Sequence, residues 1–150
     1  MPEKETLKRV EEDKREGKSP STQAGEFVRE EIHHIREGKH GAASAKQAIA
    51  IGLSKARRSG VDLPPPKKGR VSEKTRKAAE RDTKAGHSRK KKSASTKRSR
   101  SSERALKREP RSAASHKALS RQAKSAARAR KKSGTKTTGG RRTQSRRKAA

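Results

Sequence analysis

Large apolar side chains are scarce in this chain, and nearly all of them precede residue 64. Of the 36 hydrophobic residues among 150, 21 are alanine, which leaves 14 Leu, Ile, Val and Phe and one Met. Only three of these fifteen follow residue 63, namely Val71, Leu106 and Leu119. A folded domain must bury enough apolar surface to offset its loss of conformational entropy. We therefore expect a core only in residues 1–63, and the composition argues against one compact domain of 150 residues.

The charges divide at the same place. Residues 1–63 carry 13 basic and 11 acidic residues, whereas residues 64–150 carry 32 basic and 5 acidic residues and so hold +27 of the net charge of +29. Three consecutive prolines, Pro64 to Pro66, mark the boundary and favour a stiff, extended connection. The sequence predicts four segments: a charged N-terminal segment (1–20), a helical hairpin module (21–63), a proline-rich linker (64–70) and a disordered polycationic segment (71–150), here called the basic tail.

Two helices with apolar faces are predicted in the hairpin module. The first covers residues 23–37, has its apolar positions at i, i+3 and i+4, and ends at Gly38. The second begins at Ser44, which forms a capping box with Gln47, and continues to residue 58. Two such short helices bury little surface, so we expect the hairpin to dimerise or to dock on a partner. The predicted packing residues are Phe27, Val28, Ile32, Ile35, Ile49 and Leu53.

The predicted fold class is mostly α, with a small N-terminal helical hairpin followed by a largely disordered, transiently helical basic tail. Residues 112–132 are rich in alanine, which favours helix. The cations of this stretch recur at i, i+3 and i+4 and repel one another, so we expect helix mainly when phosphates neutralise them.

Several function classes are disfavoured by composition. The chain has no Cys, Trp or Tyr and one Phe, so thiolate metal sites and aromatic platforms for stacking bases are absent. No nucleophile and base are placed together, and we expect neither an enzyme nor a cofactor. The N-terminus is charged and no long apolar run occurs, so we expect a cytoplasmic protein without membrane insertion.

One group of residues invites interpretation as a metal site. His33, His34 and His40 lie close in sequence to three acidic residues, Glu30, Glu31 and Glu37. Carboxylate-bridged metal sites in helical bundles need matching ligands from other helices, and the second predicted helix offers none. We therefore interpret these residues as a solvated polar face and predict no metal site.

The basic tail carries the strongest functional signal. The positive charges of residues 64–150, +27 in total, repel one another unless an anionic partner neutralises them. The phosphates of about 14 base pairs of duplex carry the matching negative charge. We expect non-sequence-specific DNA binding driven by release of counterions. The candidate nucleic-acid-binding residues are Lys67, Lys68, Arg70, Arg89, Lys90, Lys91, Lys92, Lys97, Arg98, Arg100, Arg104, Lys107, Arg108, Arg121, Lys124, Arg128, Arg130, Lys131, Lys132, Arg141, Arg142, Arg146, Arg147 and Lys148.

Three alternatives stay open. The same charges would serve an RNA-associated or ribosome-associated protein. The hairpin could instead be the functional part, an adaptor that recruits a protein partner. Sequence-specific DNA readout by the second helix is the least favoured, because that helix offers few base-reading side chains beyond Lys46, Gln47, Lys55, Arg57 and Arg58.

The hairpin module also carries a resemblance to a known family. Residues 26–41 (EFVREEIHHIREGKHG) and 46–57 (KQAIAIGLSKAR) resemble a family of small bacterial proteins of unknown function, commonly labelled hypothetical or DNA-binding, and the match covers about residues 20–66. The resemblance implies a bacterial cytoplasmic protein and assigns no catalytic residue. The basic tail is similar in composition to the tails of linker histones and bacterial histone-like proteins, which implies a nucleoid-associated role in coating or bridging DNA.

Overall fold

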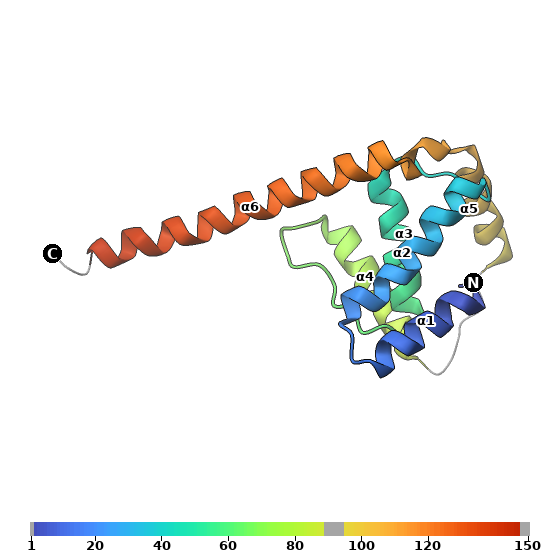
Figure 1. Cartoon of the computed structure of the whole chain (residues 1–150), viewed down its shortest axis with the longest axis horizontal. Coiled ribbons are helices and arrows are strands. Elements are labelled where there is room, and N and C mark those ends of the chain that lie inside the picture. The colour runs from blue at the N-terminus through green and yellow to red at the C-terminus, as the bar shows by residue number, and fades with distance from the viewer. Residues whose placement is uncertain (1, 89–94, 148–150) are drawn as a thin grey trace. The chain divides into compact units, whose positions relative to one another are not determined.

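The computed structural model is helical and divides into two units (Figure 1). It describes residues 2–88 and 95–147, with side chains as far as Lys132. The first unit, Met1–Ser115, is called the helical body below, and the second, His116–Ala150, contains one long helix. The helices are α1 (Lys4–Arg15), α2 (Pro20–Glu37), α3 (Ala45–Arg58), α4 (Glu73–His87), α5 (Thr96–Arg108), the short 3-10 helix η1 (Arg111–Ala114) and α6 (His116–Arg147). The mostly α class is confirmed.

The two predicted helices of the hairpin are present with the predicted end signals. Gly38 ends α2 in the left-handed conformation, with φ of 81°. Ser44 caps α3 by accepting a hydrogen bond from the Gln47 amide at 3.2 Å. The Gln47 side chain reaches back to the amide of Ala43, at 2.8 Å, and not to that of Ser44 itself. Helix α2 starts one turn earlier than predicted, because Ser19 caps it at Pro20.

Helices α2 and α3 pack very closely, and the core lies around them. A Cβ atom added to Gly52 of α3 would lie 2.6 Å from the Cα of Val28, so only glycine permits this approach. Phe27 is fully buried in a cluster with Val10 of α1 and Val61 beyond α3. Of the six predicted packing residues, two are fully buried (Phe27 and Ile35) and four are half-buried (Val28, Ile32, Ile49 and Leu53).

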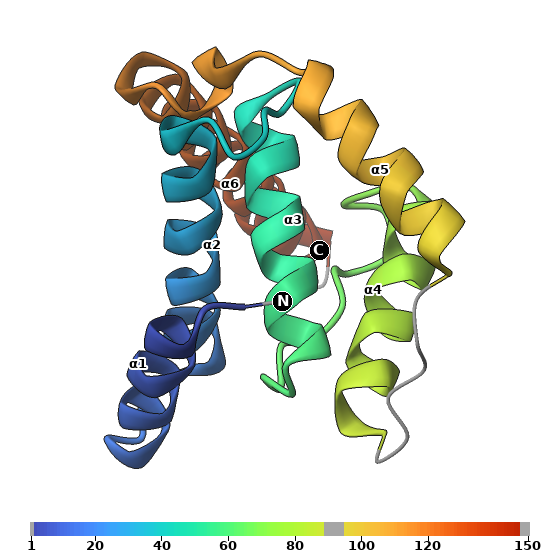
Figure 2. The same ribbon diagram turned by 90° about the vertical axis from the view of Figure 1, so that its right-hand side faces the viewer.

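The helical body is longer than the predicted hairpin, first because α4 packs on α3. In Figure 2, α3 stands between α2 and α4. Ala79 of α4 is buried, and Asp82 accepts hydrogen bonds from Ser54 at 2.6 Å and from Arg58 at 2.7 Å. The expectation that residues after 63 have no packing face is wrong for this helix, since a small residue and one polar anchor make the contact without large apolar side chains. The predicted linker, residues 64–70, thus runs within the body.

A second segment of the predicted tail, residues 106–114, is also part of the body. The amides of Gly41 and Ala42 donate to the carbonyl oxygens of Leu106 and Pro110, at 2.9 and 3.1 Å. Ala114 is fully buried against Ile35 and the start of α3. Backbone hydrogen bonds and alanine methyl groups hold this segment in place. Neither feature is visible in the distribution of large apolar residues, so the sequence did not predict this contact. Disorder of the basic tail in solution stays a prediction.

Candidate nucleic-acid interface

Helix α5 presents a row of cations on one face. Lys97, Arg100, Arg104 and Arg108 are spaced by three and four residues, so they lie on one side of the helix, and all four are exposed. Together with Ser101 and Ala105 they line a groove of about 560 Å³. The half-buried Leu106 lies on the opposite side. We call these four residues the α5 stripe.

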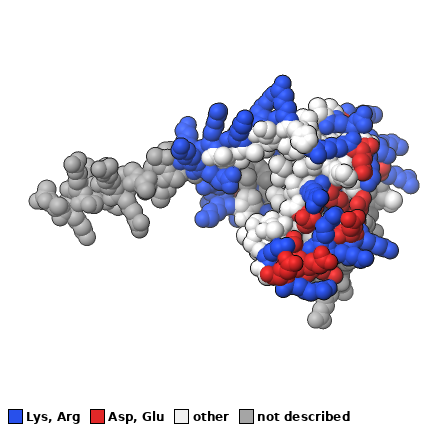
Figure 3. Space-filling model, in the orientation of Figure 1, with Lys and Arg blue, Asp and Glu red and all other residues white. Residues whose placement is uncertain are grey.

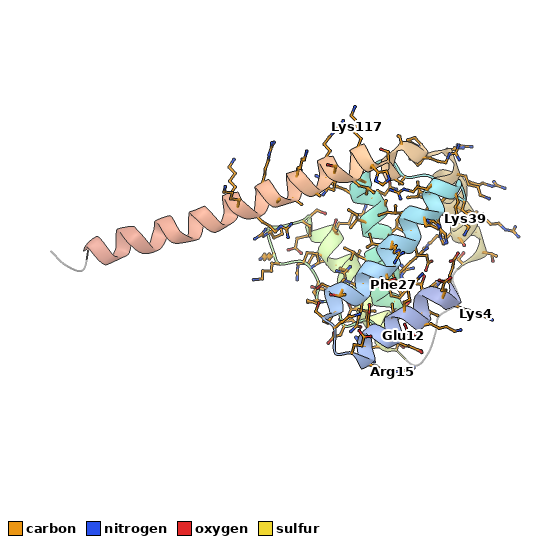
Figure 4. All side chains as sticks on the ribbon, viewed as in Figure 1. Lys4, Glu12, Arg15, Phe27, Lys39 and Lys117 are labelled. Carbon is orange, nitrogen blue, oxygen red and sulfur yellow. The ribbon has the colours of Figure 1, made fainter. Side chains whose placement is uncertain are left out.

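The described part of α6 repeats this pattern. Lys117, Arg121, Lys124 and Arg128 share one face with the same spacing, and all are exposed; we call them the α6 stripe. Figure 4 shows Lys117 projecting away from the helix. The neighbouring cations Arg130, Lys131 and Lys132 are exposed as well. Since no acidic residue follows Glu109, the cations of α6 have no acidic neighbour along their own helix.

Helix α4 carries a third stripe that sequence reasoning missed. Lys74, Lys77, Arg81 and Lys84 are exposed and lie opposite the face that packs on α3; we call them the α4 stripe. The i, i+3, i+7 spacing was a sufficient signal in the sequence. These four cations are separated by other residues, so they form no contiguous run of Lys and Arg. Among the described residues, none of the twelve stripe cations forms an ion pair.

The remaining candidate cations are more scattered. Lys67, Lys68 and Arg70 are exposed on the connection before α4, and Arg98 and Lys107 are exposed on α5 beside its stripe. Lys107 pairs with Glu103 at 2.8 Å, which lowers the pKa of that carboxyl. The other candidates lie outside the described residues or outside the described side chains: Arg89, Lys90, Lys91, Lys92, Arg141, Arg142, Arg146, Arg147 and Lys148.

Acidic side chains gather instead on α1 and α2, as Figure 3 shows. Arg9 of α1 pairs with Glu5 at 3.1 Å and with Glu26 of α2 at 3.0 Å. Glu3 is bound by His34 at 2.8 Å and by Lys39 at 3.0 Å, and these hydrogen bonds lower the pKa of Glu3 to about 2. The body therefore has a surface of mixed charge at α1 and α2 that differs from the cationic stripes.

The five base-reading candidates of α3 are mostly engaged within the protein. Gln47 completes the helix cap, and Lys55 contacts Glu31 at 2.6 Å. Arg57 is 7% exposed and donates to the carbonyl of Leu63 at 3.3 Å, and its burial lowers the pKa of its guanidinium. Arg58 is held by Asp82, as described above. This geometry disfavours reading of bases by α3.

Comparison with known proteins supports only a coarse relationship. Residues 8–68 match the model of a family of unknown function (DUF6496). The matched part begins within α1, continues through α2 and α3 and ends within the linker, so it includes neither the α4 stripe nor the α5 and α6 stripes. No curated protein and no solved structure matches the chain. Within the described residues, no helix has the length and apolarity that a membrane crossing requires.

Proposed function

We propose that this protein binds duplex DNA without sequence preference, through the cationic stripes of α4, α5 and α6. The observation that carries the proposal is the sorting of cations onto one exposed face of each helix, where no carboxylate of the described residues pairs with them. Lysine and arginine on such faces displace condensed cations from the phosphate backbone, and this release drives binding. The engagement of most base-reading candidates of α3 within the protein supports binding without base recognition.

A single stripe carries fewer charges than the length of duplex that it spans. From Lys97 to Arg108 the α5 helix rises about 16 Å. The same length of duplex bears about ten phosphate charges. Four cations neutralise fewer than half of these, so we expect binding to use several stripes together with the runs of the tail. A chain with several such elements can bridge two duplexes, which fits a role in coating or bridging the nucleoid.

The test is a salt series on the full chain with a random duplex. The four residues of the α5 stripe are replaced by glutamine in one variant. The matched control replaces four exposed cations of α1 by glutamine, namely Lys4, Lys8, Lys14 and Arg15, so that both variants lose the same charge. Figure 4 shows Lys4 and Arg15 at the two ends of α1.

The slope of the logarithm of the binding constant against the logarithm of the salt concentration counts the phosphates that the protein neutralises. Its magnitude is expected to fall by about 3 in the stripe variant and by less than about 1 in the control. Equal changes in both variants would refute the stripes as binding faces and leave only net charge. Duplex RNA of the same length is measured in parallel. Tenfold tighter binding to RNA at equal salt would replace DNA by RNA as the partner.

A further inference from the structure

Glu31, His34 and His40 come together on the helical body. Glu31 and His34 are one turn apart on α2, and His40 lies in the connection to α3. Each offers one ligand atom, and these three atoms lie within 4.8 Å of one another. The left-handed Gly38 turns the chain back after α2 and brings His40 over the same face.

The cluster is largely withdrawn from solvent, contrary to the solvated face that the sequence suggested. Glu31 is 1% exposed, and the side chains of His34 and His40 are 11% and 15% exposed. The neighbouring Glu30 is also buried. His33 and Glu37, from the same set, are exposed as expected. His40, from the connection between α2 and α3, completes the group without any residue of the second predicted helix.

The ring of His40 is oriented as a metal ligand would be. Its Nδ1 lies 3.0 Å from the carbonyl oxygen of Gly41, and because a carbonyl only accepts, this bond places a proton on Nδ1. The Nε2 atom faces Glu31 Oε1 at 2.9 Å. Metal-binding histidines are typically fixed by such a bond from the other ring nitrogen. The close approach of Nε2 and Oε1 is favourable when a proton or a metal ion lies between the two atoms.

The carboxylate of Glu31 has charged neighbours but no directed donor. Lys55 Nζ lies 2.6 Å from Oε2, yet neither oxygen of this buried carboxylate has a contact with hydrogen-bond geometry. Lys55 is also shared with the buried Glu30, at 3.5 Å. Two buried carboxylates therefore share one ammonium group, although Glu30 also accepts a hydrogen bond from the Glu3 amide at 3.2 Å. The two negative charges against one ammonium favour a further cation at the cluster.

The ring of His34 is fixed from outside the cluster. Its Nε2 lies 2.8 Å from Glu3 Oε1, and Lys39 Nζ lies 3.0 Å from the same oxygen. A carboxylate in contact with a ligand histidine is a common outer support of metal sites, because it fixes the orientation of the ring. Glu3 thus connects the start of α1 to the cluster.

We propose that Glu31, His34 and His40 form a binding site for Zn²⁺. Two imidazole nitrogens and one carboxylate oxygen are the ligand set that zinc accepts, with a fourth position for water, whereas Mg²⁺ and Ca²⁺ prefer oxygen ligands alone. The site joins α2 to the connection whose Gly41 amide holds Leu106. Bound zinc would therefore brace the loop on which the segment 106–114 docks.

The first test titrates the full, tag-free chain with Co²⁺, without nucleic acid. We expect the intense visible absorption of four-coordinate Co²⁺ to appear. Added Zn²⁺ is then expected to displace the Co²⁺ and remove this absorption. Replacement of His34 or His40 by glutamine is expected to raise the Zn²⁺ Kd at least about tenfold. The matched control is His33→Gln, which removes an exposed histidine from the same helix and is expected to leave the Kd unchanged.

Thermal unfolding gives a second readout on the unaltered chain. At a free Zn²⁺ concentration of 100 times the Kd, Tm is expected to rise by about 10 °C, and Mg²⁺ at the same concentration is expected to leave it unchanged. A weak, six-coordinate Co²⁺ spectrum, or a loss of affinity in His33→Gln equal to that in His40→Gln, would overturn the proposal. Because every measurement is made without DNA, the outcome is independent of the proposed function.

Discussion

Replacing Ala114 by glycine tests whether the segment after α5 is part of the folded body. Ala114 is fully buried between Ile35 and Ala48. Removing its methyl group loses about 0.8 kcal/mol of burial, and the added backbone freedom of glycine costs about another 0.5–1 kcal/mol. The expected destabilisation is about 1.5 kcal/mol, which corresponds to a fall in Tm of about 6 °C for a unit of this size.

The chain supplies its own control, because the motif around Ala114 recurs in α6. Ala127 ends the stretch KSAA as Ala114 ends RSAA, but Ala127 is exposed. Ala127→Gly is expected to leave the Tm of the body unchanged. Amide hydrogen exchange gives the local readout, since the amides of Gly41 and Ala42 should exchange faster only in Ala114→Gly. Equal effects of the two substitutions, or unchanged exchange in Ala114→Gly, would refute the docking of this segment.

Three further predictions concern the body. Asp82→Asn weakens the anchor of α4 and is expected to lower the free energy of unfolding, measured with urea, by about 1–2 kcal/mol. This loss is at the low end for a charged hydrogen bond because the side chain of Arg58 is 66% exposed. Gly52→Ala places a Cβ 2.6 Å from Val28 Cα and is expected to cost about 1–3 kcal/mol in the same assay, whereas an unchanged midpoint would contradict the close packing. The pKa of Glu3 is about 2 in the folded chain, against an ordinary value of 4.5, so its interactions stabilise the fold above pH 4.5 and this stabilisation is lost as the pH falls toward 2. In Glu3→Gln, the urea midpoint is therefore expected to depend less on pH over that range.

Much of the hairpin could be predicted from local sequence signals. The capping serine and glutamine of α3, the terminal Gly38 and the apolar spacing around Phe27 are all short-range features, and the structure contains each of them. Local signals succeed here because a helix end must satisfy its own free backbone groups, and only a few residue types do so.

The contacts of α4 and η1 could not be predicted by the same reasoning. They depend on Ala79, Ala114 and the glycines that permit close approach, and small residues carry no periodic apolar signal. The convergence of His34 and His40 on Glu31 was missed for a related reason. It depends on the path of a connection, which the spacing of residues within a helix does not specify.

The cationic stripes have no acidic partners because the carboxylates that form ion pairs after position 63 bind cations outside the stripes. Glu73 and Glu80 both bind Arg76, at 3.3 and 2.5 Å, while Asp82 binds Arg58 and Glu103 binds Lys107. These carboxylates are thus occupied in holding α4 to α3 and in stabilising single turns, on positions outside the three stripes. The stripe cations consequently lack an acidic partner within the described chain, and their mutual repulsion favours the binding of an external polyanion. The interactions that stabilise the body and the charge that we expect to bind DNA are therefore two results of the same placement of a small number of carboxylates.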